Sequence, residues 1–385
     1  MEKLSTNSQE PQILSPDPIF QMATGFWVSK TLMSALELEI FTKLSGYRAV
    51  NIEELQNILA MQHRPTEVFV TALISLGLLK VEHDDTFQSG NPSAPSDDAD
   101  FDSNDNRLYS NSELAETFLD KNKPSGYMGD FVIMLDKQMY NRWGRLTEAL
   151  KTNSPVQSGS GAGDLKSVGS AFEGAKDGQT TKAQMQMFTH AMYGVSVAPA
   201  KALTKVFNFS EHKKMMDIGG GSGVYAIEAV KACPNMSATV IDLEPACNVA
   251  SEYINKFHLQ ERIGTLILDF VKQDLPKDCD VALLSHIIHF LDVEKGKALL
   301  KKIYDSLPDD RKGVVLISEW LLNDEKTGPV PSALLSLTMI VEQPEGRNYS
   351  FAEISKILKD VGFTNIEKRQ LAGPADVVIG YKIRV

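Results

Sequence analysis

Hydrophobic and polar residues follow two different patterns along the chain, one before and one after about residue 209. Apolar residues first recur at spacings of three and four, which is typical of amphipathic helices, over 19–60, 111–150 and 181–207. Further on, short apolar runs of strand length alternate with helical stretches, as they do in α/β folds with a parallel sheet. We therefore predict a mainly helical N-terminal part followed by an α/β domain.

The helical part contains a pattern that resembles a winged-helix domain. A helix expected over 63–79 follows a short capped helix that begins at Asn51, and two short strands are expected near 78–81 and 107–110. We predict four parts: a flexible tail over 1–17, a winged-helix domain over 18–120, a helical linker that lines the substrate site over 121–208, and the α/β domain over 209–385.

An acidic segment separates the two expected wing strands. Between Glu82 and Asn106 there are eight aspartate or glutamate residues and no lysine or arginine, and serine, asparagine, glycine and proline fill most of the remainder. Such a composition cannot bury enough apolar surface to compensate for the entropy of ordering the chain. We predict a disordered insertion over 82–106.

A glycine-rich turn connects the first expected strand of the α/β domain to the helix after it. An apolar run over 214–218 is followed by glycines at 219, 220, 221 and 223, and helical spacing resumes at Val224. Strand, glycine turn and helix N-terminus together form a cofactor cradle at the carboxyl edge of a sheet. A dinucleotide fingerprint would need a glycine where Val224 stands, and the Gly-Lys-Ser/Thr ending of a phosphate-binding loop is absent.

Acidic side chains end the next two expected strands. Asp242 lies about twenty residues after the turn, where a carboxylate can accept hydrogen bonds from ribose hydroxyls. An apolar stretch over 265–268 leads to Asp269 and Phe270, a pair that suits an adenine because the acid can bind its exocyclic amine beside a packing surface. Both positions favour an adenosyl group as the ligand of the turn.

Histidines and a further acid follow the last two expected strands. The strand over 280–285 leads to His286 and His289, and the strand over 313–318 ends at Glu319. Because open α/β sheets bind ligands outside the carboxyl ends of their strands, we expect these residues to belong to one site. We interpret His286 as a structural residue.

The composition excludes several classes of function. A net charge of −11 over 385 residues argues against nucleic acid as the main partner, because phosphate contacts need clustered lysine and arginine. The three cysteines, Cys233, Cys247 and Cys279, show neither Cys-x-x-Cys nor zinc spacing, so we expect free thiols and no metal. No apolar run reaches the ~18 residues of a membrane span, and the N-terminus resembles neither a secretory signal nor a transit peptide. We expect a cytoplasmic protein without a membrane partner.

The glycine turn and the strand-end residues resemble the class I methyltransferases that use S-adenosylmethionine (SAM). The stretch Asp217-Ile218-Gly219-Gly220-Gly221-Ser222-Gly223 resembles their first motif. With the winged-helix pattern, roughly 18–382 is similar to the O-methyltransferase family that includes caffeate, acetylserotonin and bacterial small-molecule methyltransferases, through Asp242, Leu243, Asp269, Phe270, His289, Glu319, Gly346, Arg347, Gly362 and Phe363. The resemblance implies a Rossmann-like seven-stranded SAM domain, an N-terminal winged-helix dimerisation domain and a homodimer.

The resemblance also implies which residues bind the cofactor. Asp217, Gly219, Gly221 and Gly223 would hold the methionine part of SAM. The rest of the implied set is Asp242 and Leu243 at the ribose, Asp269 and Phe270 at the adenine, and Ser285, which stands where the plant enzymes have a lysine.

Three residues match the catalytic positions of the family. His289 matches the general base, and an imidazole can take a proton from a hydroxyl as that hydroxyl attacks the methyl group. Glu319 matches the acid that orients this histidine. The family's second acid is here Asn348, which can form hydrogen bonds but carries no charge. We predict methyl transfer to a heteroatom of a small molecule, a hydroxyl oxygen above all, with release of S-adenosylhomocysteine.

The acceptor itself stays open. We expect its site between the helices over 127–146 and 185–196 and the segment 334–348, with Arg142, Trp143, Phe188, Met192 and Arg347 as candidate contacts.

Two alternatives to O-methylation remain. One is S-methylation of a thioether such as methylthiohydroxybutyrate in dimethylsulfoniopropionate synthesis, which needs no base; its carboxylate would pair with Arg142, Arg145 or Arg347. The other is a winged-helix regulator with a SAM-sensing domain. The single basic residue within the 63–79 helix, Arg64, and the acidic wing argue against the regulator.

Overall fold

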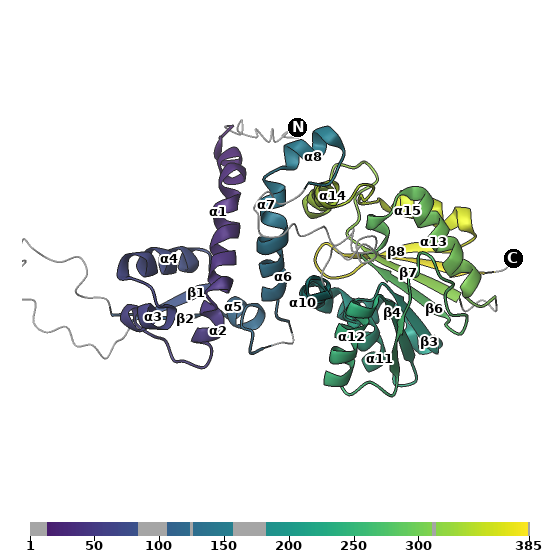
Figure 1. The fold of residues 1–385 in the computed structure, drawn as a ribbon, viewed down its shortest axis with the longest axis horizontal. Helices are drawn as coiled ribbons and strands as arrows, with labels where there is room; N and C mark the ends of the chain where they lie inside the picture. The colour runs from purple at the N-terminus through teal and green to yellow at the C-terminus, as the bar shows by residue number, and fades with distance from the viewer. Residues whose placement is uncertain (1–13, 84–105, 124–125, 157–181, 310–312, 384–385) are drawn as a thin grey trace, which may run out of the picture. The chain divides into compact units, whose positions relative to one another are not determined.

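The computed structural model describes residues 14–83, 106–123, 126–156, 182–309 and 313–383. The chain divides into two compact units, 1–122 and 123–385 (Figure 1). Most of the expected tail over 1–17 and of the expected acidic insertion over 82–106 lies outside the described residues.

The first unit is helical apart from a two-stranded ribbon. Asn51 starts one of its helices with a capping box, in which the Asn51 side chain accepts from the Glu54 N–H and the Glu54 carboxylate accepts from the Asn51 N–H. The antiparallel strands β1 and β2 lie where the sequence predicts the two wing strands. The elements are α1 (Asp17–Glu37), α2 (Ile40–Leu44), α3 (Ile52–Leu59), α4 (His63–Ser75), β1 (Leu79–His83), β2 (Arg107–Asn111) and α5 (Glu113–Phe118).

The N-terminal half of α1 exposes large apolar side chains. Phe20, Met22, Phe26 and Trp27 are each more than half exposed, whereas Leu36 near the end of the helix is buried. The Trp27 ring lies 6.4 Å from that of Phe20 and 6.0 Å from that of Phe26. Because soluble monomers rarely expose contiguous apolar groups of this size, this end of α1 has the character of an interaction surface.

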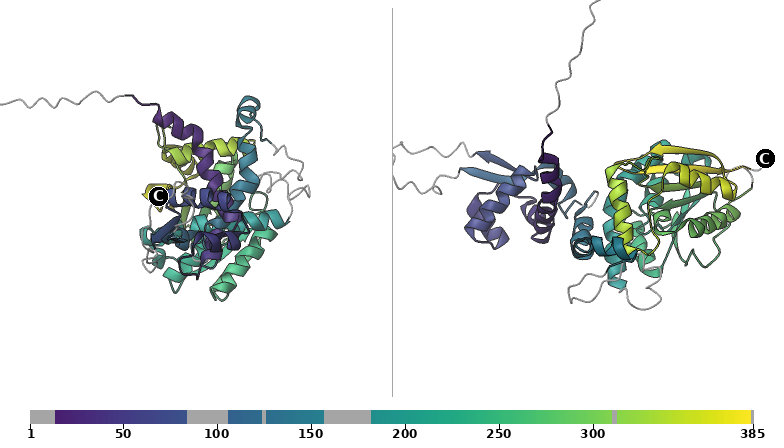
Figure 2. Two further views of the ribbon diagram at one scale, coloured as in Figure 1. Left: turned by 90° about the vertical axis from the view of Figure 1, so that its left-hand side faces the viewer. Right: turned by 90° about the horizontal axis from the view of Figure 1, so that it is seen from above.

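The second unit is built on a seven-stranded sheet with the order β5-β4-β3-β6-β7-β9-β8. The strands from β5 to β7 are parallel, and β9 is antiparallel to both β7 and β8. The strands are β3 (Lys214–Ile218), β4 (Ser237–Asp242), β5 (Ile263–Ile267), β6 (Val281–Ser285), β7 (Gly313–Glu319), β8 (Thr364–Gln370) and β9 (Asp376–Lys382). The yellow strands, β8 and β9, form one edge of the sheet in the right-hand view of Figure 2. The predicted Rossmann-like α/β fold is confirmed.

Alternate residues of the strands face two separate helical layers. Met215 packs in the layer of α10, α11 and α12, whereas its neighbour Met216 packs in the layer of α13 and α15. Both are completely buried, as expected for a parallel sheet covered on both faces. The helices are α10 (Lys182–Val206), α11 (Val224–Ala232), α12 (Glu244–Lys256), α13 (Val293–Ser306) and α15 (Phe351–Val361).

The segment expected to be a helical linker, 121–208, belongs from Lys123 onward to the same compact unit as the sheet. It contains α6 (Gly129–Met134), a π-helical turn η1 (Leu135–Met139), α7 (Tyr140–Trp143) and α8 (Leu146–Thr152) before α10. A further helix, α14 (Val330–Glu342), contacts α7 and α8. Among the described residues, no helix combines the length and the apolar character that crossing a lipid bilayer requires.

The tight packing around Gly380 in β9 predicts a specific weakness. A side chain at Gly380 would place its Cβ 3.2 Å from Val315 Cγ1 and 3.4 Å from Leu358 Cδ1, in a buried part of the sheet. We expect Gly380→Val to lower the free energy of unfolding by about 1–3 kcal/mol through overpacking. Gly264→Val in β5 is the matched control, because a Cβ there meets nothing within 4 Å. Urea unfolding curves with equal stability for the two variants would contradict this account.

Candidate active site

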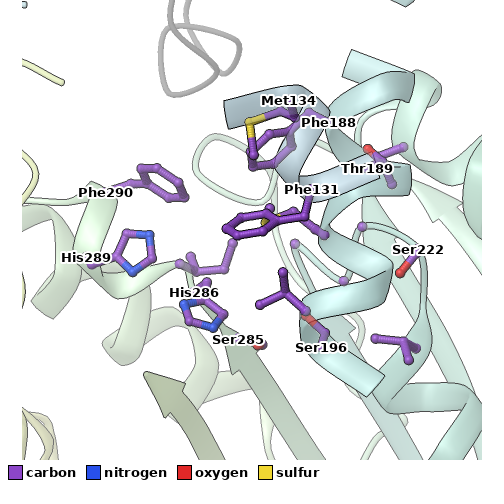
Figure 3. Close-up of a pocket in the computed structure, with 18 of the residues that line it drawn as sticks. Phe131, Met134, Phe188, Thr189, Ser196, Ser222, Ser285, His286, His289 and Phe290 are labelled. Carbon is purple, nitrogen blue, oxygen red and sulfur yellow. The ribbon is translucent and has the colours of Figure 1, made fainter. Parts of the chain in front are cut away.

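A cavity of about 500 Å³ lies at the carboxyl ends of the parallel strands. Its walls combine strand-end residues with three helical segments, within 131–139, 185–196 and 331–342. Figure 3 shows His286, His289 and Phe290 on one side of the cavity and Phe131, Met134 and Phe188 on the other. The cavity therefore joins the glycine turn, the histidines and an apolar chamber in one space.

The glycine turn forms the wall between β3 and α11. Gly219, Gly221 and Gly223 all have positive φ, a conformation that glycine adopts without strain. A Cβ on Gly219 would come within 2.3 Å of Ile287 Cδ1, so a larger residue would clash directly with the neighbouring loop. Gly223 is the N-cap of α11, which places the N-terminal end of that helix next to the cavity. The turn thus leaves backbone exposed to a ligand, as a cofactor cradle requires.

Asp217 lies at the end of β3, beneath this turn, and is completely buried. Neither of its carboxylate oxygens has a hydrogen-bond partner of ordinary geometry in the described part of the chain. Burial raises the pKa of Asp217 to about 7, the nearby charge of Asp242 adds to the effect, and the amide of Ala226 only partly offsets it. A buried acid that lines a cavity without a full set of partners is a group that a cationic ligand would satisfy.

Asp242, at the end of β4, is held by the backbone around it. Its Oδ2 accepts from the Gly221 N–H at 2.9 Å and its Oδ1 from the Leu243 N–H at 2.7 Å. Burial raises the pKa of Asp242 to about 6, against these two hydrogen bonds, which lower it. Asp242 therefore couples the glycine turn to β4 and presents a carboxylate to the same cavity.

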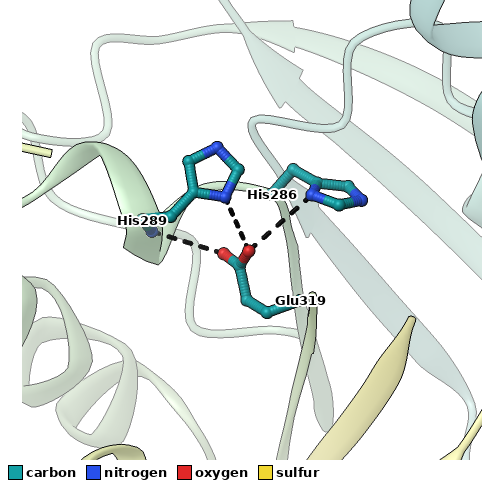
Figure 4. A group of neighbouring side chains, drawn as sticks. All are labelled: His286, His289 and Glu319. Atoms are coloured by element: carbon teal, nitrogen blue, oxygen red, sulfur yellow. Dashed lines mark hydrogen bonds and ion pairs between the residues drawn. The ribbon is translucent and has the colours of Figure 1, made fainter. Parts of the chain in front are cut away.

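A buried histidine–carboxylate pair stands at the ends of β6 and β7. His289 Nδ1 lies 2.7 Å from Glu319 Oε2, and the backbone N–H of His289 donates to Glu319 Oε1 at 3.4 Å (Figure 4). The Ile288 N–H donates to the same oxygen at 3.0 Å. Burial alone would raise the pKa of Glu319, but the His289 charge and hydrogen bond outweigh it, so this pKa lies below its ordinary value. With Nδ1 directed at an ionised carboxylate, the other ring nitrogen of His289 points away from Glu319.

His286, interpreted from the sequence as structural, also lines the cavity. It has a positive φ of 55°, and its Nδ1 lies 3.7 Å from Glu319 Oε2. Burial lowers the pKa of His286 to about 4, although the Glu319 charge opposes this, so the ring is neutral at pH 7. One ring nitrogen of His286, one of His289 and one carboxylate oxygen of Glu319 lie within 4.8 Å of one another. Zinc can also bind to nitrogen and oxygen atoms of this kind. The 2.7 Å contact between His289 and Glu319 has the length of a hydrogen bond, which fits a shared proton.

The chamber in front of the histidines is strongly apolar. Its walls include Phe131, Met134, Phe188, Met192 and Phe290. No lysine or arginine is found among the described residues that line the cavity. Flat, apolar molecules are the ligands that such walls favour.

Of the residues predicted to bind the cofactor, the cavity wall contains Asp217, Gly219, Gly221, Asp242, Leu243 and Ser285. Gly223, Asp269 and Phe270 are not part of this wall. Phe270 is nevertheless close, because its Cε1 would lie 3.5 Å from a Cβ on Gly219. Asp269 is bound locally, by its Oδ1 to the Val271 N–H and by an ion pair with Lys272.

Two of the residues predicted at the acceptor, Phe188 and Met192, line the cavity, and Trp143 packs against the cluster that contains them. Arg142 is buried and faces Glu342 instead, with Nη1 3.6 Å from Oε1. Arg347 is half exposed and pairs with Glu353 at 2.9 Å. Neither arginine contributes to the cavity wall.

Asn348, predicted as the substitute for a second catalytic acid, is buried outside the cavity wall. Its side-chain amide donates to the Trp320 carbonyl at 2.8 Å, and its backbone N–H to Ser336 Oγ at 3.3 Å. In this arrangement Asn348 supports the loop after β7.

Sequence reasoning missed several wall residues. The π-helical turn supplies Leu135 and Met139, Trp320 follows β7, and Glu342 ends α14. Of these residues, only Glu342 could have been recognised from the sequence, because it is an acid at the end of the otherwise uncharged stretch 330–342.

Comparisons with known proteins point to one family. A family model described as the O-methyltransferase domain matches residues 143–364, and one described as the O-methyltransferase dimerisation domain matches residues 20–121. The chain is 30% identical over 372 residues to the tetracenomycin polyketide synthesis 8-O-methyl transferase TcmO of Streptomyces glaucescens, covering 97% of this chain and 98% of that protein. It is 32% identical over 381 residues to the 3-hydroxy-5-methyl-1-naphthoate 3-O-methyltransferase of Streptomyces sahachiroi, covering 98% and 99%.

A solved structure shares the fold over the full length. Human N-acetylserotonin methyltransferase in complex with SAM superposes with a TM-score of 0.80 at 24% identity, covering 98% of this chain and 100% of that one. The chain therefore belongs to the O-methyltransferase family, and it is a methyltransferase that uses SAM.

Proposed function

We propose that the protein methylates the hydroxyl group of an aromatic small molecule, with His289 as the general base. The observation that carries this proposal is the buried His289–Glu319 pair, which faces an apolar chamber in the same cavity as the glycine turn. Relatives named for the methylation of a polyketide and of a hydroxynaphthoate support an aromatic acceptor.

The donor end of the cavity is suited to SAM. Bound SAM supplies an activated methyl group on a sulfonium and carries an ammonium on its amino-acid part. The backbone of the glycine turn and the buried Asp217 carboxylate would hold that amino-acid part, because a cation satisfies the acid that the fold leaves without full partners. Asp242 would accept hydrogen bonds from the ribose, with Phe270 packed behind the turn.

The acceptor end supplies the base. Glu319 fixes the His289 ring through Nδ1, so that the second ring nitrogen is available to the cavity. That nitrogen takes the hydroxyl proton as the oxygen attacks, and the Glu319 carboxylate stabilises the imidazolium that forms. The remaining requirement is alignment of oxygen, methyl and sulfur, which the walls of the cavity would have to provide.

S-methylation of a carboxylate-bearing thioether has weaker support. Arg142, Arg145 and Arg347 pair with Glu342, Glu148 and Glu353, respectively. A thioether also has no proton to lose, so it gives the buried His289–Glu319 pair no task.

We further propose that the protein is a homodimer formed through the first unit. The exposed aromatic residues of α1 fall within the region that matches the dimerisation family model. A second copy of the chain would cover this apolar surface and remove it from water.

Removal of the base should slow turnover strongly and spare donor binding. We expect His289→Gln to lower kcat by about 10²–10⁴-fold on a phenolic acceptor, because general-base catalysis typically contributes that much. His83→Gln, at an exposed position of β1, is the control. The measurement is release of S-adenosylhomocysteine, with SAM affinity followed by calorimetry. A near-normal kcat for His289→Gln would exclude the base role.

Asp217→Asn should weaken SAM binding and flatten the pH dependence of stability. The pKa of Asp217 in the folded protein, about 7, lies above its ordinary value of 3.8, so its contribution to stability is present below pH 4 and lost as the pH rises through 7. This pKa difference corresponds to about 4 kcal/mol of stability that the native protein loses as the pH rises. An asparagine does not ionise, so the variant should not show this loss. We expect at least about tenfold weaker SAM binding, since an ionic hydrogen bond disappears.

Thermal unfolding at pH 5 and pH 8 tests the pH dependence, and calorimetry with SAM tests the binding. Asp305→Asn, at an exposed position of α13, should change neither. If Asp217→Asn binds SAM as tightly as the native protein, Asp217 has no place in the donor site.

Light scattering should report a mass near twice the 42.5 kDa of one chain. Phe26→Glu combined with Trp27→Glu should shift the protein toward the monomer, because the charged side chains would be buried at the interface. Val68→Glu, on an exposed position of α4, is the control. A single-chain mass for the native protein at micromolar concentration would rule out the dimer.

A further inference from the structure

One face of α14 lines the cavity at helical spacing. Leu334, Leu335, Thr338, Met339 and Glu342 follow one another at steps that keep them on the same side of the helix. Most of these positions carry apolar or weakly polar side chains, and the last carries an acid. A carboxyl group therefore enters the cavity wall at a position where the pattern of the helix favours an apolar side chain.

Glu342 is 8% exposed, yet it has spare hydrogen-bonding capacity. Among the described residues, no hydrogen bond reaches its carboxylate, and its ionic contact is with Arg142, whose Nη1 lies 3.6 Å from Oε1. That distance is too long for a hydrogen bond. A buried carboxylate normally accepts several hydrogen bonds, so Glu342 is poised to accept one from a ligand in the cavity.

Arg142 holds this carboxylate in place. It lies in α7, directly after the π-helical turn η1, and is 2% exposed. π-Helical turns are frequent at functional sites, because the extra residue shifts the side chains that follow around the helix axis. Glu342 is part of the cavity wall and Arg142 is not. Arg142 therefore contacts Glu342 from outside the wall, and the Glu342 carboxylate is the charged group of the pair that a ligand would meet.

The electrostatic setting agrees with a carboxylate that has an ionic partner and no hydrogen-bond donor among the described residues. Burial raises the pKa of Glu342 to about 7, and the positive charges of Arg142 and His289 only partly offset this. Glu342 and the proposed base His289 also line the same cavity. Glu342 is thus a strong acceptor in reach of a molecule bound at His289.

The rest of the chamber offers few other means of orientation. Phe131, Met134, Leu135 and Met139 contribute apolar surface, which binds a ring system without fixing how it is turned. A single polar group in such a wall has a large effect on which molecules bind, because an unmatched buried acceptor costs more than a mismatched apolar contact.

We propose that Glu342 is a specificity-determining residue that accepts a hydrogen bond from a second O–H or N–H group of the acceptor, with Arg142 as its positioning residue. His289 engages the hydroxyl that is methylated, and Glu342 engages a donor elsewhere on the same ring system. The preferred acceptors are aromatic compounds with two separated donor groups. The inference rests on the proposed function, since it assigns the second contact of the same acceptor.

Paired naphthalene probes test this directly. The probes are 2,6- and 2,7-dihydroxynaphthalene and 1,6-dihydroxynaphthalene, each compared with its mono-methyl ether and with 1- and 2-naphthol. Two quantities are measured for each: Kd with the S-adenosylhomocysteine-loaded protein by calorimetry, and kcat/KM for methyl transfer by mass spectrometry. We expect at least one diol to exceed its monohydroxy partners by about 10- to 100-fold in both, the range of a hydrogen bond to a charged group.

Two variants remove the second contact in different ways. Glu342→Gln keeps the shape and removes the charge, so the preference for the diol should fall several-fold. Arg142→Met combined with Glu342→Met replaces the whole pair by apolar residues of similar volume, which avoids an unpaired buried arginine, and the preference should disappear. Glu345→Gln is the matched control, because Glu345 lies three residues further along, in the loop after α14, at an exposed position and paired with Lys295. It should keep the native preference.

The outcomes separate the two proposals. A diol preference in binding that is lost in the Glu342 variants supports the inference, even if no probe is methylated, in which case the proposed function fails alone. Methyl transfer without any diol preference, or a preference that survives in the double variant, overturns the inference and leaves the proposed function standing. If the double variant does not fold, an unchanged preference in Glu342→Gln overturns it as well.

Discussion

The site depends on one short contact, the hydrogen bond between His289 and Glu319. The two residues are thirty positions apart in the chain and meet because β6 and β7 pair in parallel, with Ser285 opposite Ser318. Glu319 ends β7 and His289 lies in the loop after β6, so a shift of this register by one residue would turn the carboxylate to the other face of the sheet. The mostly buried neighbouring strands, β3 and β9, resist such a shift. The rigidity of the sheet is therefore the source of the geometry of the pair.

The same fold carries several acids in surroundings that disfavour their charge. Burial raises the pKa values of Asp217, Asp242 and Glu342, and each of these residues faces the cavity. Buried charges of this kind lower stability in the absence of a ligand, and the well-packed layers on the two faces of the sheet compensate for it. Binding then recovers part of this free energy, because a cation or a hydrogen-bond donor supplies what the protein leaves open. The free-energy cost of burying these acids and the affinity for a ligand thus have a common cause in this molecule.

A larger share of the residues predicted at the donor than of those predicted at the acceptor lines the cavity, for a physical reason. Glycines at 219, 221 and 223 and the acid Asp242 follow from local rules, since a turn with positive φ and a strand-end carboxylate each belong to one short stretch of chain. The acceptor wall comes from α6, α10 and α14, and helical periodicity shows which residues are buried without showing which helices meet. Arg142 illustrates the limit: the sequence indicates a cation near the substrate, and only the tertiary structure shows that Glu342 neutralises it.

The apolar character of the chamber makes its few polar groups decisive. Burial of a ring system against Phe131, Phe188 and Met192 supplies affinity that depends little on orientation, since the hydrophobic effect is not directional. Methyl transfer, by contrast, requires one oxygen in line with the donor. One polar contact at His289 leaves the ring free to rotate about that point, whereas a second contact at Glu342 removes the rotation. Two polar groups set in an apolar wall are therefore sufficient to select one hydroxyl among several on the same molecule, and the distance between them decides which one.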